Sequence, residues 1–197
     1  MKREFKTEKR LNKIINTLKN RQQSLHVVIE NVHDPHNVSA IFRSCDAVGV
    51  PEVSLLYTVE SFPKISNVSS SSAAKWVEKK LFNDVEKCYS ELKNKGFKIY
   101  ASMLDENAIS LFDIDFTEKV AIVVGNEHRG VSEEAAELAD ARFYIPMMGM
   151  VQSLNVSVAT AVSLYEAQRQ RLKNQMYEKS EMNEEQINSL IDEWCKK

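Results

Sequence analysis

The sequence of 197 residues lacks most of the features that mark secreted, membrane-bound or nucleotide-binding proteins. Its three cysteines are an odd number and lie far apart, which predicts free thiols in a reducing compartment. No apolar run approaches the roughly 20 residues of a membrane span, and the first residues lack the apolar stretch of a signal peptide. The five glycines form neither a Gly-x-Gly-x-x-Gly fingerprint nor a Gly-Lys-Ser/Thr loop, which argues against ordinary dinucleotide and nucleoside-triphosphate folds. We therefore expect a cytoplasmic protein without a membrane segment.

Charge is nearly balanced over the whole chain, at −2, but it is unevenly distributed. Within residues 1–23 basic side chains far outnumber acidic ones, and residues 5–20 space their apolar side chains as an amphipathic helix does. A basic helix attracts phosphate groups whatever the sequence that carries them, although a merely solvated helix face has the same composition. The basic side chains are Lys2, Arg3, Lys6, Lys9, Arg10, Lys13, Lys19 and Arg21.

Short apolar strands alternate with helices between residues 24 and 176, a pattern typical of an α/β domain with a parallel sheet. We expect this domain (24–176) between a basic amino-terminal helix (1–23) and a helical tail (177–197) that packs on another part of the protein. Residues 58–75 are rich in serine and have no periodicity, which predicts a long loop. The predicted strands are 25–29, 53–56, 98–102, 120–124 and 142–145. The predicted helices are 38–48 with Asn37 as N-cap, 84–96, 132–139, and one from Leu154 onward with Ser153 as N-cap.

The stretch from Ile145 to Arg171 carries the most unusual pattern. Pro146 ends a strand because proline offers no donor to a sheet, and Gly149 permits a tight loop. A helix of small and β-branched residues follows. Free backbone N–H groups and the positive end of the helix dipole lie at its start, which suits an anionic ligand group. Three polar side chains gather there: Gln152, Ser153 and Asn155.

Three motifs, in a fixed order along the chain, resemble those of the SpoU/TrmH family of RNA ribose methyltransferases. Together they cover roughly residues 24–176, and three ordered motifs are far more specific than one. The motifs are Asn37 to Arg43 in Asp-Pro-His-Asn-Val-Ser-Ala-Ile-Phe-Arg, then Gly125-Asn126-Glu127-x-x-Gly130, then Ile145-Pro-Met-x-Gly followed by Ser153-Leu-Asn-Val-Ser.

The resemblance implies an α/β fold with a C-terminal trefoil knot, S-adenosyl-L-methionine (SAM) as a cofactor bound within the knot, and a homodimer. By match to the motifs it implies catalytic roles for Arg43, Asn37, Glu127, Ser153 and Asn155. It further implies that Ser102, Gly125, Ile145 and Leu154 contact the cofactor. The basic residues expected to bind RNA are Lys9, Arg10 and Lys13 of the amino-terminal helix and Arg169 and Arg171 of the last predicted helix of the α/β domain.

Most of these residues also have an ordinary structural explanation when they are taken alone. Arg43 among apolar neighbours resembles an arginine that buries its stem and exposes its head. Asn37 resembles an N-cap, and Glu127 a solvated residue of a turn. His33 and His36 are spaced like a weak ligand pair, but no cysteine or third histidine lies nearby in the sequence, so we expect no metal site.

Methylation of a ribose 2′-hydroxyl is an in-line displacement at a sulfonium methyl group, which needs no metal. We expect Arg43 to pair with the target phosphate and to stabilise the nascent alkoxide, because a guanidinium stays protonated. The proton would then leave through phosphate, Ser153 or water. Within the family the sequence is most similar to the enzymes that methylate the D-loop guanosine of tRNA.

Two kinds of alternative remain at this point. The RNA substrate could instead be the tRNA anticodon loop or ribosomal RNA, since the serine-rich segment offers only Lys64 and Lys75 to grip a tRNA. From a different class, the chain could be a non-catalytic RNA-binding factor on the same fold. The presence of all five polar motif residues argues against a factor without catalysis. A cofactor-binding titration would separate the two classes, because a pure binding factor has no need of the methyl donor.

Overall fold

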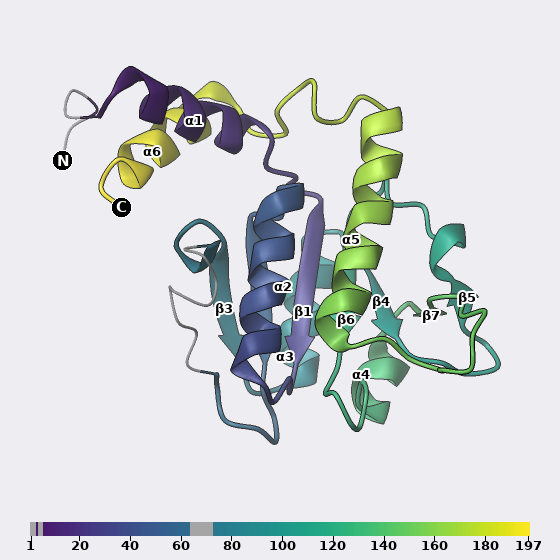
Figure 1. Cartoon of the computed structure of the whole chain (residues 1–197). Helices are drawn as coiled ribbons and strands as arrows, with labels where there is room; N and C mark the ends of the chain where they lie inside the picture. Colours follow the sequence, from purple (N-terminus) through teal and green to yellow (C-terminus); the bar gives the residue numbers. More distant parts are fainter. Residues whose placement is uncertain (1–2, 4–5, 64–72) are drawn as a thin grey trace.

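We describe the fold from a computed structural model, which covers residue 3, residues 6–63 and residues 73–197 (Figure 1). Its strands are β1 (Leu25–Glu30), β2 (Glu52–Leu56), β3 (Glu78–Phe82), β4 (Lys98–Ser102), β5 (Ile109–Ser110), β6 (Val120–Val124) and β7 (Ala141–Tyr144). Its α-helices are α1 (Glu8–Lys19), α2 (Pro35–Val48), α3 (Val85–Asn94), α4 (Glu133–Leu138), α5 (Val156–Lys173) and α6 (Glu184–Trp194), and short 3-10 turns are η2 (Ala73–Lys75) and η3 (Leu111–Asp113).

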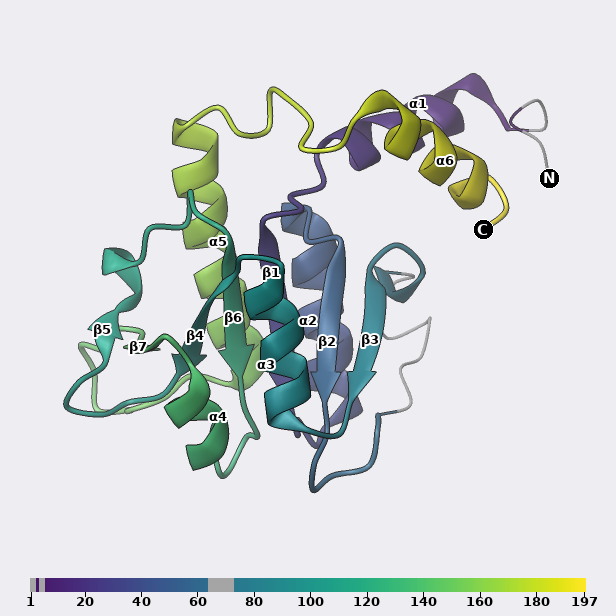
Figure 2. The ribbon, with the colours of Figure 1, turned by 180° about the vertical axis from the view of Figure 1, so that it is seen from behind.

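The seven strands form one parallel sheet in the order β3-β2-β1-β6-β4-β7-β5. Strands β1 and β6 lie at its centre, and every residue of both is buried, as expected for near-continuous apolar strands covered on both faces. Helices α2 and α5 cover one face and pack on each other (Figure 1), while α3 and α4 cover the other face (Figure 2). The prediction of a parallel α/β domain is confirmed.

Helices α1 and α6, from opposite ends of the chain, pack together at one end of the molecule (Figures 1 and 2). Between them lies a small apolar cluster separate from the two clusters of the sheet, with Ile14, Leu18, Ile191 and Trp194 among its members. The ring of Trp194 lies 4.9 Å from that of Trp76. The predicted tail helix therefore exists, and its packing partner is the amino-terminal helix.

Two predicted helix starts were wrong. Asp34, not Asn37, is the N-cap of α2: its Oδ1 accepts a hydrogen bond from the backbone N–H of His36 (2.8 Å), and Pro35 supplies the fixed backbone angle that favours the first helical position. Asn155, not Ser153, is the N-cap of α5, and its Oδ1 accepts from the N–H of Ser157 (2.9 Å). In both cases the true cap frees the predicted residue for other contacts.

Two strands escaped prediction, and the last predicted strand was displaced by one residue. The sheet edge β3 reads Glu-Lys-Lys-Leu-Phe, and charges on an edge strand hide the apolar pattern while they discourage association with other sheets. Strand β5 has only two residues. Within the predicted loop 58–75, residues 73–75 form η2, whereas Lys64 and the serines of 66–72 lie outside the described residues, as does Lys2. No helix in the described part of the chain combines the length and apolar character needed to span a bilayer.

Candidate functional site

A cleft of about 530 Å³ opens at the carboxyl ends of β4, β6 and β7, the edge where parallel sheets usually place ligands. All four residues predicted to contact a cofactor line it: Ser102, Gly125, Ile145 and Leu154. A larger cleft of about 730 Å³ lies at the opposite end of the sheet, against α6. None of the predicted catalytic or cofactor residues lines that larger cleft. The residues that line a cleft, and not the volume of the cleft, therefore identify the smaller one as the candidate site.

The loop after β6 forms a tight turn with its own hydrogen-bonded frame. The backbone of Asn126 exchanges two 2.9 Å hydrogen bonds with that of Gly130, whose φ of +70° lies in the left-handed region. A Cβ atom on Gly125 would lie 2.2 Å from the backbone of Gly130 and Val131, so no side chain fits there. The side-chain Nδ2 of Asn126 donates to the carbonyl of Asn31 (2.8 Å) and ties the turn to β1.

Three of the five predicted catalytic residues form a continuous line of hydrogen bonds. Asn37 donates through Nδ2 to Oε1 of Glu127 (2.8 Å), and Asn155 donates through Nδ2 to Oδ1 of Asn37 (3.1 Å). The three residues come from α2, the loop after β6 and the start of α5. Elements far apart in the sequence are thus joined at one edge of the sheet.

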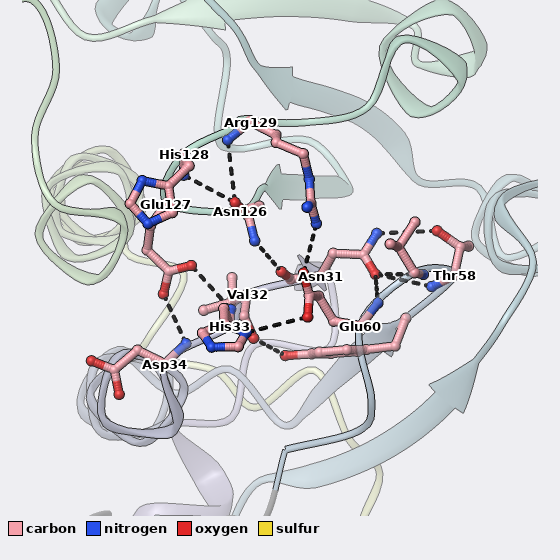
Figure 3. Close-up of polar contacts among 12 residues, drawn as sticks. Asn31, Val32, His33, Asp34, Thr58, Glu60, Asn126, Glu127, His128 and Arg129 are labelled. Atoms are coloured by element: carbon pink, nitrogen blue, oxygen red, sulfur yellow. Dashed lines mark hydrogen bonds and ion pairs between the residues drawn. The ribbon is translucent and has the colours of Figure 1, made fainter.

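The Glu127 carboxylate also accepts hydrogen bonds from the backbone N–H groups of His33 (3.0 Å) and Asp34 (3.1 Å), as Figure 3 shows. Burial opposes its ionisation. However, the hydrogen bonds from Asn37 and from the backbone favour the charged form and hold the pKa of Glu127 below its usual range. The carboxylate of Glu127 fixes the orientation of the Asn37 amide, and that amide in turn presents its oxygen to Asn155.

Ser153 and Arg43 do not join this line. Ser153 lines the cleft and is exposed. Arg43 lies six residues beyond Asn37, about 9 Å further along α2, and its side chain does not line the cleft. It is exposed, and within the described ranges no side chain forms a hydrogen bond or ion pair with it. The two residues therefore remain available to a ligand from outside.

The residues predicted to bind RNA fall into two groups. Lys9 and Lys13 are exposed on α1, where Arg10 lies 5.0 Å above the Trp76 ring. Arg169 is also exposed and pairs with Glu166 through two 2.8 Å hydrogen bonds. Each of these four basic side chains is at least partly open to solvent.

The prediction for Arg171 was wrong, because its side chain is fully buried. Its guanidinium donates to the carbonyls of Phe116 (2.9 Å), Glu118 (3.0 Å) and Ser24 (3.0 Å). It donates further to Oγ of Ser24 (2.7 Å) and to the side-chain oxygen of Gln22 (3.1 Å). All five N–H donors of an arginine are used in this way. Arg171 fastens the end of α5 to the body of the protein and cannot reach RNA.

Comparison with known proteins agrees with this geometry. Residues 24–165 match the SpoU rRNA Methylase family. The chain belongs to this SpoU family. It is 45% identical over 192 residues to the tRNA (guanosine(18)-2'-O)-methyltransferase of Thermus thermophilus, covering 98% of each chain.

Two solved SpoU structures are also similar. The Aquifex aeolicus TrmH/SpoU tRNA modifying enzyme has a TM-score of 0.89 and 42% identity, covering 95% of both chains. The SpoU methyltransferase AviRb of Streptomyces viridochromogenes, solved in complex with AdoMet, has a TM-score of 0.70 and 25% identity, covering 79% of this chain and 64% of that one.

Two further polar residues lie at the same edge of the sheet in this SpoU chain and were not predicted. Asn31 directly follows β1, and a polar residue after a buried strand was the only sign of it in the sequence. Arg129 occupies an unspecified position of the second motif and lines the cleft. Their importance depends on contacts with residues 58–60, which no local pattern reveals.

Proposed function

We propose that this protein is a SAM-dependent tRNA 2′-O-methyltransferase that acts on guanosine 18 of the D-loop. The observation that carries the proposal is the likeness to the Thermus thermophilus enzyme, which extends over 98% of both chains. It thus includes the terminal helices α1 and α6 as well as the α/β domain. An enzyme of this kind would work in the cytoplasm, and the three cysteines, which are all free and buried, fit a reducing compartment.

The cleft has the size and chemistry to hold SAM. Its volume of about 530 Å³ falls in the range of roughly 300–1,000 Å³ found for small-molecule sites. The apolar side chains of Ile145 and Leu154 offer a surface for the adenine ring, while Ser102 and the backbone of Gly125 offer polar contacts. When bound, SAM supplies the methyl group and its own leaving group.

The residues around the cleft divide the remaining work. The hydrogen bonds that link Glu127, Asn37 and Asn155 hold the start of α5 against α2. They thereby fix the elements against which a ribose must be oriented. Ser153 lies at the mouth of the cleft, where its hydroxyl can relay the proton of the attacking 2′-hydroxyl. Arg43, which lies outside this cleft, offers its exposed guanidinium to a substrate phosphate and to the alkoxide, because a guanidinium donates hydrogen bonds and does not accept them.

A homodimer forms part of the proposal. Helix α5 exposes an apolar stripe at seven-residue spacing: Val158 (47% exposed), Tyr165 (54%) and Leu172 (57%). Met148 and Met150, in the loop before α5, are almost fully exposed. Apolar side chains aligned on one exposed helix face suit an interaction site, and a second copy of the chain is its proposed occupant. Sedimentation should show a dimer that Tyr165→Glu converts to a monomer and Tyr165→Phe does not.

We also propose the trefoil knot and the division of labour that the family resemblance implies. The path of the chain supports a knot: β6 lies between β1 and β4, and after β7 the chain returns across the sheet to α5 beside α2. Residues 24–176 would form the catalytic domain. The segments 1–23 and 177–197 would together present Lys9, Arg10 and Lys13 to the tRNA, since α1 and α6 pack on each other.

The decisive experiment uses purified protein, labelled SAM and unmodified tRNA transcripts, followed by mapping of the 2′-O-methyl group. We expect a single mark at guanosine 18, which Arg43→Ala abolishes. A transcript with 2′-deoxyguanosine at that position is the matched control, because it lacks only the accepting hydroxyl. A methyl group at another nucleotide would support 2′-O-methyl transfer but refute guanosine 18 as the target. Absence of cofactor binding would refute the proposal that the protein is a methyltransferase.

A further inference from the structure

Arg129 stands at the rim of the cleft in an ion pair that the proposed chemistry does not use. Its Nη2 donates a 2.8 Å hydrogen bond to Oε1 of Glu60, and the other carboxylate oxygen of Glu60 lies 3.2 Å from Nδ1 of His33 (Figure 3). Glu60 therefore joins the second motif to the loop before α2, which also carries the backbone donors to Glu127. The pair belongs to the same edge of the sheet as the catalytic line.

Glu60 is held in place from behind by Asn31. The side-chain oxygen of Asn31 accepts hydrogen bonds from three successive backbone N–H groups, those of Thr58 (3.0 Å), Val59 (3.0 Å) and Glu60 (3.1 Å). Asn31 has a φ of +48°, in the left-handed region that asparagine tolerates better than most residues. An unusual backbone angle and four hydrogen bonds, including one to Oγ1 of Thr58 (3.1 Å), are thus used to fix one end of the ion pair.

The other end is fixed as well. The side-chain oxygen of Asn126 accepts from the N–H groups of His128 (3.0 Å) and Arg129 (3.2 Å), which sets the backbone from which the Arg129 side chain extends. Both partners of the pair are therefore preorganised before any substrate arrives. A surface ion pair that served stability alone would gain little from such support.

The guanidinium of Arg129 is held by Glu60, but this contact uses only part of its hydrogen-bonding capacity. It has five N–H donors, and Glu60 takes one of them. No other described side chain pairs with Arg129, and its side chain is 57% exposed. A planar guanidinium with free donors on a fixed support is suited to bidentate contact with a phosphate group.

We propose that Arg129 binds a backbone phosphate of the RNA next to the target nucleotide, and that Glu60 is the positioning residue that holds the guanidinium toward it. This inference rests on the proposed function, because it takes RNA as the substrate. The hydrogen bond from Arg129, and then that from His33, keep the pKa of Glu60 below its usual range, so the support stays charged at neutral pH. The site adds a substrate contact that lies outside the three motif assignments.

The test measures binding of an unmodified tRNA transcript to the full-length protein at several salt concentrations, together with the KM for tRNA and the affinity for SAM. Arg129→Gln should weaken tRNA binding about tenfold. The fall of log affinity with log salt concentration should also become less steep, by about 1 in slope, because one phosphate contact is lost. Glu60→Gln keeps the positive charge but releases the guanidinium. It should raise the KM for tRNA a few-fold with the salt slope unchanged. Lys87→Gln is the control, since Lys87 is an exposed cation of α3 with one carboxylate partner, Asp84 (3.7 Å).

Several outcomes would overturn the inference. If Arg129→Gln behaves like Lys87→Gln, Arg129 makes no phosphate contact. If Glu60→Gln binds tRNA more tightly, Glu60 competes with phosphate instead of positioning the arginine. If Arg129→Gln loses SAM affinity, the arginine serves the cofactor. Failure of the wild-type protein to methylate tRNA refutes the proposed function, whereas normal methylation by wild type and Arg129→Gln alike refutes this inference alone.

Discussion

Arg171 provides the sharpest test of how the α/β domain is held together. Replacement by alanine removes five hydrogen bonds at once and leaves the carbonyls of Phe116, Glu118 and Ser24 without their donor. It also leaves Glu181 without the cation 3.6 Å away. Removal of one member of a buried charged network costs about 3–5 kcal/mol. Arg171→Ala should therefore lower the free energy of unfolding by that amount, a large part of the roughly 5–15 kcal/mol of a typical protein.

Urea unfolding followed by circular dichroism measures this loss. Lys173→Ala is the matched control: it lies two residues later on the same helix and is exposed, so its replacement should cost less than about 1 kcal/mol. Arg171→Lys should fall between the two, because three ammonium donors cannot serve five acceptors. A loss below about 1 kcal/mol for Arg171→Ala, combined with a reduced salt dependence of tRNA binding, would refute the buried position and restore the RNA-binding role predicted from the sequence.

Three further predictions concern the cleft, the pH dependence of stability and the terminal helices. Gly125→Ala should destabilise the protein by about 1–3 kcal/mol and abolish calorimetric SAM binding, because its Cβ meets backbone at 2.2 Å; Gly149→Ala, with nothing within 4 Å, should be nearly neutral. Burial lowers the pKa of His26 from 6.5 to about 3. Since the unfolded state then binds more protons, unfolding free energy should fall by about 2 kcal/mol from pH 7 to pH 5 through this group, and His26→Gln should flatten the profile. Trp194→Ala should release α6 and shift the emission of Trp76, then the sole tryptophan, to longer wavelength.

The sequence predicted the parts of the fold that depend on local apolar pattern. The runs at β1 and β6 are apolar enough to indicate a sheet buried on both faces, and the second and third motifs located the cleft through Gly125 and Leu154. The charged edge strand β3 and the two-residue β5 have no such pattern. Their place in the sheet depends on partners distant in the sequence, so no local pattern indicates them.

The errors at single residues have the same origin. Asp34 and Asn37 are equally good caps by residue type, and so are Ser153 and Asn155. For the first pair, the Asn37 side chain donates to Glu127, 90 residues further along the chain, and the cap is left to Asp34. Arg171 could have been placed correctly from the helical period. It continues the buried face of Thr160, Leu164 and Ala167, whereas Arg169 points away from that face.

The pairing of α1 with α6 has a consequence for the order in which the molecule is completed. Helix α1 ends at Lys19 and leaves the ribosome early, but most of the side chains that share a cluster with Ile14 and Leu18 come from α6, which ends at Trp194. At about 5–20 residues per second, synthesis separates the two helices by on the order of ten seconds or more. During that interval Trp76 is available to the apolar face of α1, but Met182 and the members of the cluster from α6 are not. The terminal pair is therefore the last part of the protein to assemble, and a chain that stops before α6 would lack it even with the whole sheet in place.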